Sequence, residues 1–222
     1  MKTMVVAAAL IIWGSGQALA ADVAASEIAP AGFVWSGGYV GLQAGYGWGD
    51  TRFDDDAYRP SQPMDIGGLT AGVTIGYNYQ FHPNWVAGVE ADFSWSGIDG
   101  READIGGSWG CDDACSTEIE WYGTARVRLG YAIDRLLVFG TGGLAVGRVH
   151  GELEGAGPVW DNEHTNVGWA AGAGVEYAFT QNWTAKLEYM HIDLGWTDRT
   201  GPAEFTTDAD FDALRFGINY KF

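Results

Sequence analysis

Four histidines, His82, His150, His164 and His191, are the residues of this sequence best suited to acid–base catalysis. Such a role needs a nucleophile and a group that orients the imidazole, both within hydrogen-bond reach. The sequence places no serine beside His150 or His191, and no third orienting group is evident. We therefore interpret the histidines as polar residues of connecting segments. We predict no enzyme, no catalytic residue and no cofactor-binding residue.

Carboxylates and thiols raise a second kind of chemistry, which is metal binding. Asp50 and the run Asp54–Asp56 carry oxygen ligands that suit Ca²⁺. Their spacing is not that of an EF-hand loop, and runs of charge are usually solvated. Cys111 and Cys115 lack a second Cys or His pair at the spacing of a zinc site. The sequence therefore predicts no metal site.

Charged residues also occupy alternate positions within otherwise apolar segments. Five are acidic and five are basic, so their formal charges cancel. In chain order they are Glu90, Asp92, Glu120, Arg126, Arg128, Glu176, Lys186, Glu188, Arg215 and Lys221. Charges that leave water must be paired. We therefore predict that these residues form one network of ion pairs on the inner face of the structure that the segments build.

The N-terminus predicts export. A basic residue, Lys2, precedes the apolar run Val5–Trp13, and Ala18 to Ala20 form an A-x-A cleavage site. The apolar run is too short to span a membrane as a helix. We therefore predict a signal peptide, residues 1–20, which directs Sec-type export and is cleaved between Ala20 and Ala21.

Composition narrows the class of protein further. The 222 residues include 34 Gly, 11 Trp, 10 Tyr and 10 Phe, a composition that favours an all-β protein. The formal net charge of −17 argues against binding to nucleic-acid phosphates. Because an exported chain meets an oxidising environment, we expect Cys111 and Cys115 to form a disulfide.

Apolar and polar residues alternate in eight segments, as they do in strands with one apolar face. In the clearest case, odd positions from Leu69 to Phe81 are apolar, and even positions from Thr70 to Gln80 are small or polar. The segments lie near residues 39–48, 67–81, 85–96, 119–131, 136–149, 167–179, 183–189 and 214–222. Short turns near 82–84, 132–135 and 180–182 alternate with long loops near 50–66, 97–118, 151–165 and 195–210. This order predicts consecutive antiparallel hairpins.

Aromatic residues indicate which medium the apolar faces meet. They gather beside the short turns and again toward the long loops, with Val, Leu, Ile and Ala between, as at the two interfaces of a bilayer. A soluble ligand-binding barrel with its apolar face inward is the alternative. Its exterior would have no need of balanced charges or frequent Gly. We therefore predict an all-β fold, an eight-stranded antiparallel up-and-down transmembrane β-barrel, closed by pairing of the first and last segments.

Several short motifs resemble those of a known family. They are Trp35-Ser36-Gly37-Gly38-Tyr39-Val40-Gly41, Gly140-Thr141-Gly142-Gly143-Leu144-Ala145, Leu187-Glu188-Tyr189 with Asp193-Leu194-Gly195, and Tyr220-Lys221-Phe222. In this order they resemble the small eight-stranded outer-membrane barrels of Gram-negative bacteria, the OmpA-like and opacity-type proteins, often described as porin family or outer-membrane immunogenic proteins. The resemblance covers essentially the whole mature chain. It implies insertion by the outer-membrane assembly machinery, with Tyr220 and Phe222 as the insertion signal, and a structural, surface-antigen or adhesion role.

These observations predict three parts: the signal peptide 1–20, a short periplasmic N-terminal tail 21–35, and an outer-membrane β-barrel 36–222. We expect a structural, surface-exposed protein of the outer membrane with a largely plugged polar lumen and long acidic extracellular loops. The alternative is a small porin that conducts ions or small solutes. The expected partners are outer-membrane lipids and lipopolysaccharide, the assembly machinery, and host or environmental ligands at the loops.

Overall fold

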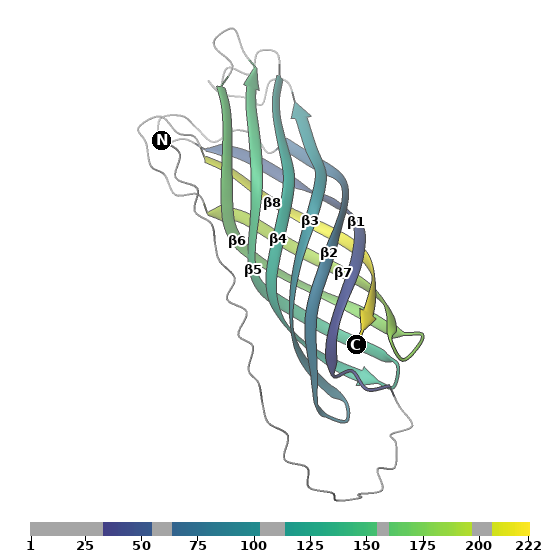
Figure 1. Cartoon of the computed structure of the whole chain (residues 1–222). Coiled ribbons are helices and arrows are strands. Elements are labelled where there is room, and N and C mark those ends of the chain that lie inside the picture. Colours follow the sequence, from purple (N-terminus) through teal and green to yellow (C-terminus); the bar gives the residue numbers. More distant parts are fainter. Residues whose placement is uncertain (1–32, 55–63, 103–113, 155–159, 197–205) are drawn as a thin grey trace, which may run out of the picture. The chain divides into compact units, whose positions relative to one another are not determined.

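Alternating residues build long antiparallel strands, because side chains of opposite parity lie on opposite faces of a sheet. The computed structural model describes residues 33–54, 64–102, 114–154, 160–196 and 206–222. The strands within these ranges are β1 Gly37–Asp54, β2 Met64–His82, β3 Trp85–Glu102, β4 Ala114–Ile133, β5 Leu136–Glu154, β6 Trp160–Ala178, β7 Trp183–Trp196 and β8 Thr206–Lys221 (Figure 1). Among the described residues no helix is both long and apolar enough to cross a bilayer.

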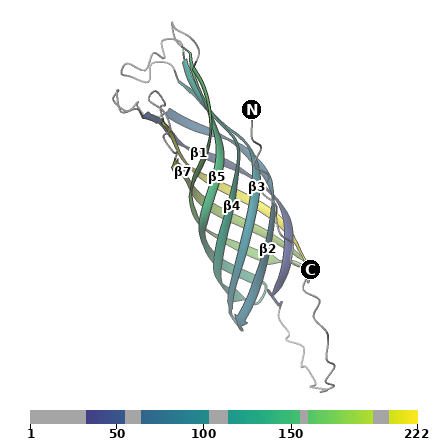
Figure 2. The same cartoon turned by 60° about the vertical axis from the view of Figure 1, so that its left-hand side comes forward.

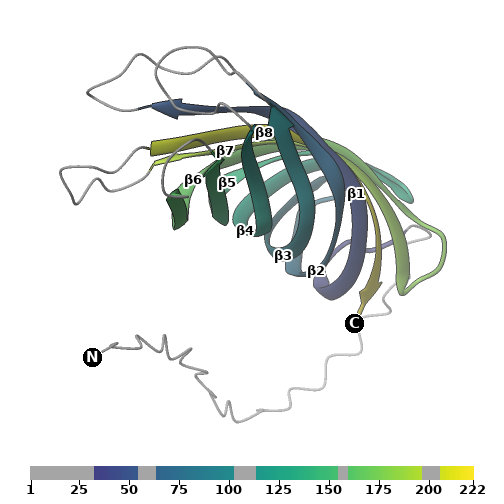
Figure 3. The ribbon, with the colours of Figure 1, turned by 90° about the horizontal axis from the view of Figure 1, so that it is seen from above.

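Each strand pairs antiparallel with the next, and β1 pairs with β8, so the sheet closes into a barrel. In Figure 2 the strands of the near wall cross those of the far wall, as the tilt of a closed barrel requires. The yellow end of β8 lies beside purple β1 in Figure 3. The register of this seam runs from Tyr39 opposite Lys221 to Asp54 opposite Thr206. The predicted all-β, eight-stranded up-and-down barrel is confirmed, including the pairing of its first and last strands.

The short turns lie where the sequence predicts them, but the strands are longer than their apolar segments. β3 continues to Glu102 and β4 begins at Ala114, so half of the loop expected at 97–118 is strand. The other three long connections are shortened in the same way. A bilayer needs only about 9–11 residues of each strand. Backbone hydrogen bonds between strands can form beyond the membrane with any side chains. The alternation of apolar side chains ends where contact with lipid ends.

The outward face of the barrel is apolar. Leu69 and Leu144 expose 74% and 66% of their surface, although both are aliphatic. Aromatic pairs lie at both ends. Trp85 packs edge to face on Tyr131 near a short turn, and Phe93 stacks on Trp121 toward the long loops. Such a surface is stable in lipid and would be costly in water.

Register shifts change the face that some residues meet. One shift lies between Trp95 and Ile98 in the pairing of β3 with β4, and another lies between Ile119 and Trp121 in the pairing of β4 with β5. An extra residue reverses the alternation beyond it. In β4 this turns Ile119 inward, where it is completely buried, and leaves Glu120 exposed. Ile98 keeps the inward parity of Glu90 and Asp92 in β3 and is also completely buried.

The fold includes residues that precede the first strand. Phe33 and Trp35 are buried, with 5% and 1% of their surface exposed. The expected tail, residues 21–35, is therefore corrected at its end, because burying two large aromatic side chains is favourable. Residues 21–32, the predicted signal peptide and its cleavage site between Ala20 and Ala21 lie outside the described residues.

Candidate functional site

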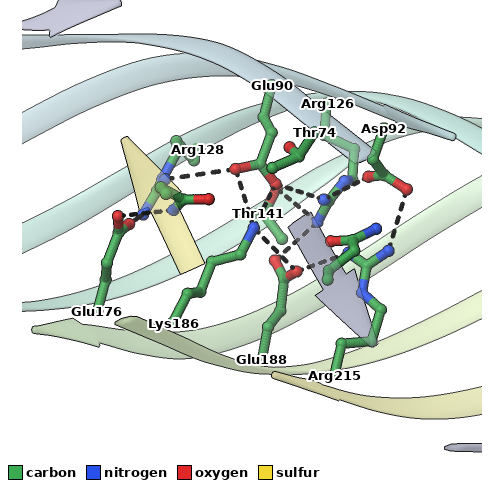
Figure 4. Close-up of polar contacts among 12 residues, drawn as sticks. Thr74, Glu90, Asp92, Arg126, Arg128, Thr141, Glu176, Lys186, Glu188 and Arg215 are labelled. Atoms are coloured by element: carbon green, nitrogen blue, oxygen red, sulfur yellow. Dashed lines mark hydrogen bonds and ion pairs between the residues drawn. The ribbon is translucent and has the colours of Figure 1, made fainter. Parts of the chain in front are cut away.

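A buried network of charges in the middle of the lumen is the candidate functional site (Figure 4). The structure brings together eight of the ten charged residues singled out by their alternation, with side chains at most 3% exposed. They are Glu90 and Asp92 from β3, Arg126 and Arg128 from β4, Glu176 from β6, Lys186 and Glu188 from β7, and Arg215 from β8. Each lies at an inward position of its strand.

Glu90 occupies the centre of this network. Its Oε1 atom lies 2.6 Å from Arg126 Nη2 and 2.9 Å from Lys186 Nζ. Its Oε2 atom lies 3.5 Å from Arg128 Nη1 and accepts a hydrogen bond of 2.6 Å from the hydroxyl of Tyr39. Three cations and a phenol therefore surround one carboxylate and occupy the acceptor positions of both its oxygen atoms.

Asp92, Glu188, Arg126 and Arg215 form a closed ring of charge-assisted hydrogen bonds. Arg215 donates to Asp92 Oδ1 at 3.0 Å and to Glu188 Oε2 at 2.6 Å. Arg126 donates to the other oxygen of each carboxylate, at 2.8 Å in both cases. Hydrogen bonds between ionised groups are about twice as strong as neutral ones. The ring therefore ties β3, β4, β7 and β8 together through the lumen.

Arg128 extends the network toward the short turns. It donates to Glu176 Oε2 at 2.7 Å, and its guanidinium carbon lies 4.0 Å from the centroid of the Phe139 ring. The other oxygen of Glu176 accepts hydrogen bonds from Thr184 at 2.6 Å and from Asn219 at 3.0 Å. The alternation of charge in the sequence did not reveal Thr184, Asn219 and Tyr39, because neutral polar residues on the inner face carry no charge pattern.

The register and the narrow barrel explain why these residues meet. Glu90 lies directly opposite Arg126 between β3 and β4, and Glu188 lies opposite Arg215 between β7 and β8. Lys186 reaches Glu90 across the lumen, because β3 and β7 stand on opposite walls of an eight-stranded ring. Eight strands leave an interior that side chains alone can fill. The four acids and four bases of the network sum to zero charge.

Glu120 and Lys221 do not belong to the network, which corrects the prediction for these two residues. The register shift beside Ile119 turns Glu120 outward, where its side chain is 43% exposed and its Oε2 atom lies 3.7 Å from Arg148 Nη1. Lys221 lies further along β8 than Arg215, and its ammonium is 5.3 Å from the centroid of the Phe33 ring. One acid and one base drop out together, so the balance of charge is preserved.

Two apolar clusters lie on either side of the network along the lumen. The base cluster, beside the short turns, consists of Phe33, Trp35, Val86, Ala132, Leu137, Phe139 and Ala178. The outer cluster, toward the long loops, consists of Ile66, Ile98, Ile119, Tyr122, Ala145, Val149, Ala170, Met190, Ile192, Leu194, Phe211 and Ala213. The sequence did not reveal the outer cluster, because most of its residues lie where the strands extend beyond the alternating segments, and because a register shift turns Ile119 inward. The lumen therefore has three layers, apolar, charged and apolar.

Other candidate residues lie outside this network. On the outward face, His191 Nδ1 lies 3.0 Å from Asp212 Oδ1, which also accepts a hydrogen bond of 2.7 Å from the hydroxyl of Tyr189. Among the described residues, no group of three or more His, Cys, Asp or Glu is placed to hold a metal ion. Cys111 lies outside the described residues, so its disulfide with Cys115 stays a prediction.

Comparison with known proteins agrees with this geometry. Residues 7–222 match the family described as outer membrane protein beta-barrel domain. The chain is 38% identical over 244 residues to the 31 kDa outer-membrane immunogenic protein of Brucella melitensis biotype 1, covering 100% of both chains. It is 32% identical to the 22 kDa outer membrane protein of Rhizobium leguminosarum bv. viciae, over 89% of this chain and 82% of the relative. The crystal structure of the outer membrane protease OmpT from Escherichia coli matches with a TM-score of 0.50 and 11% identity, over 86% of this chain and 98% of that one. At that identity, the likeness concerns the fold alone.

Proposed function

The chain belongs to the outer membrane protein beta-barrel domain family, and from this premise we propose that it is a closed, non-catalytic scaffold rather than a pore. Its place is the outer membrane of a Gram-negative bacterium. The observation that carries the proposal is the filled lumen. Every carboxylate of the charged network is paired, and apolar clusters lie on both sides of it. An ion on its way through would have to break buried ion pairs, at a cost of several kcal/mol each.

Conductance tests this proposal against the alternative of a small porin. The protein is purified from outer membranes and reconstituted in planar bilayers, with a general porin as the positive control. We expect no steady single-channel steps. The double variant Glu188→Ala with Arg215→Ala removes a neutral pair from the ring and is expected to conduct more often than the natural protein. Steady single-channel steps from the natural protein, at a frequency that rises with the amount of protein added, would contradict the closed scaffold and support the small porin.

We also propose that the long connections present the surface that hosts or the environment meet. The relative from Brucella melitensis is an outer-membrane immunogenic protein. The connecting sequences of this chain are rich in acids, among them Asp55, Asp56, Asp104, Asp112 and Asp113. Loops on a rigid barrel are where such proteins vary and bind. Antibodies raised against a peptide of residues 103–113 should label intact cells. Labelling only after the outer membrane is broken would contradict this orientation.

Lipopolysaccharide is the proposed lipid partner, through shared divalent cations. A row of four aspartates crosses four neighbouring strands on the outward face, near the aromatic residues of the outer end. Asp193 of β7 lies opposite Asp210 of β8, Asp210 lies opposite Asp50 of β1, and Asp50 lies opposite Asp65 of β2. Like charges placed directly opposite destabilise a sheet. Divalent cations that bind carboxylate and phosphate oxygens would relieve this repulsion. The arrangement suits a diffuse layer of bridging cations rather than one discrete ion.

A further inference from the structure

A short segment before β1 crosses the mouth of the barrel at the short-turn end. Phe33 and Trp35 lie inside the mouth, and their rings pack edge to face with centroids 4.8 Å apart. Val34, between them, points the other way and is 44% exposed. This alternation gives the segment an inner face made of two large aromatic rings.

The contacts of Trp35 show that the segment reaches the far wall. Its indole Nε1 donates a hydrogen bond of 3.3 Å to the carbonyl oxygen of Asp134 in the turn between β4 and β5. In the closed order of strands, β4 and β5 stand across the ring from β1, where the segment is attached. The remaining members of the base cluster come from β3, β4, β5 and β6. Trp35 therefore spans the opening instead of packing beside its own strand.

Polar contacts fix the segment at its attached end. The amide of Trp35 donates to Gln80 Oε1 at 2.9 Å, and the amide of Gln80 donates to Ser36 Oγ at 2.9 Å. Gln80 also donates from Nε2 to the carbonyl oxygen of Pro83, at 2.7 Å. On the other side, the ammonium of Lys221 lies 5.3 Å from the centroid of the Phe33 ring. Contacts to β2 and β8, the two neighbours of β1, thus hold both sides of the segment.

We propose that residues 33–36 are a strap that seals the periplasmic mouth of the barrel. Short turns face the periplasm in barrels of this kind, so the strap closes the lumen on that side. The seal is made by aromatic packing and by hydrogen bonds between side chains and backbone groups, and it does not use the charged network. The proposal therefore goes beyond a plugged lumen, because it assigns closure of one end to a separate element that can be opened alone.

Thiol labelling tests the strap directly. Ala132 is 2% exposed in the base cluster, and Ala132→Cys in a Cys111→Ser, Cys115→Ser background gives a reporter beneath the strap. The full-length protein in lipid nanodiscs is treated with a charged maleimide. With the strap intact, we expect labelling at least ten-fold slower than for Asn182→Cys in an exposed turn. Phe33→Ala with Trp35→Ala should speed labelling of the reporter at least ten-fold, whereas Val34→Ala should leave it unchanged.

The opposite results are equally clear. An equal labelling rate with and without the two aromatic side chains would overturn the strap, as would a reporter as reactive as Asn182→Cys in the presence of the strap. A shift in gel mobility on boiling shows that each variant has folded. If the double alanine variant does not fold, Gln80→Ala with Ser36→Ala removes only the polar attachment and serves instead. Conductance of the same variants reports on the charged network, so failure of one proposal is distinguishable from failure of the other.

Discussion

Glu188 illustrates how much depends on single residues in this lumen. Its carboxylate lies 2.8 Å from Arg126 and 2.6 Å from Arg215, and its side chain has no exposed surface. Lys186 lies 3.5 Å away on the same strand. Without Glu188, the three cations would keep their burial and lose the carboxylate that they share. A buried charge without its partner is among the costliest features of a folded protein.

The variant Glu188→Ala should therefore lower the free energy of unfolding by about 3 kcal/mol. Urea titration of the protein folded into lipid vesicles measures this change. Glu120→Ala is the matched control, because Glu120 pairs with Arg148 at an exposed site, where an ion pair is worth at most about 1 kcal/mol. Equal, small effects of the two substitutions would show that water reaches the network.

Parity along the strands predicted the inner position of most charged residues, because a strand in a membrane barrel can bury charge only on its lumen side. The same rule misplaced Glu120. Apolar residues, Ile119 and Trp121, flank Glu120, and this local pattern is typical of a regular strand. The register shift at that point depends on how β4 pairs with β5. No property of the segment by itself reveals the shift.

The terminal strand is an element with two roles. β8 pairs with both β1 and β7 and so completes the closed sheet. Its last outward residues carry aromatic rings, with Tyr220 and Phe222 packed edge to face at 5.5 Å. Phe222 exposes 70% of its surface, so it adds little to packing within the barrel. We propose that it is retained as the signal that the assembly machinery reads.

Phe222→Ala should accordingly reduce the rate of assembly several-fold and change stability little. The measurement is the fraction of pulse-labelled protein that becomes heat-modifiable in outer membranes. Phe179→Ala is the matched control, since Phe179 is also an exposed aromatic residue beside the short turns. If both variants assemble equally slowly, the effect belongs to the aromatic girdle and not to an insertion signal.

Strand length is the element property that the sequence predicted least well. Alternation reports where lipid touches the barrel, and lipid touches only the middle of each strand. β4 and β5 remain paired as far as Ala114 opposite Glu154. Hairpin pairing there is held by backbone hydrogen bonds, which leave no signature in side-chain polarity.

The distribution of charge is a property of the whole molecule. The chain has a formal net charge of −17, while the buried network of four acids and four bases contributes none. The excess of acid therefore lies outside the membrane interior, where water and counterions screen it. The row formed by Asp193, Asp210, Asp50 and Asp65 brings part of this excess next to the outer surface of the membrane.

Removal of divalent cations should therefore destabilise the protein where lipopolysaccharide is present. Chelation is expected to lower the melting temperature by several degrees in vesicles that contain lipopolysaccharide, and to have no effect in phosphatidylcholine vesicles. Asp210→Asn with Asp65→Asn should reduce the shift, because less repulsion is left to relieve. An unchanged melting temperature in both kinds of vesicle would count against bridging cations.

The sequence by itself determined the fold class, the closing seam and the balance of buried charge. These features follow from local rules: parity along a strand, aromatic residues at bilayer interfaces, and the cost of unpaired charge in a narrow lumen. Only the tertiary structure decided which acid meets which base, that Glu120 and Lys221 stand apart, and that Phe33 and Trp35 close one mouth. The position of Glu120 depends on a register shift, and the others depend on distances across the barrel. Both are set when the sheet closes on itself and are not encoded within any one strand.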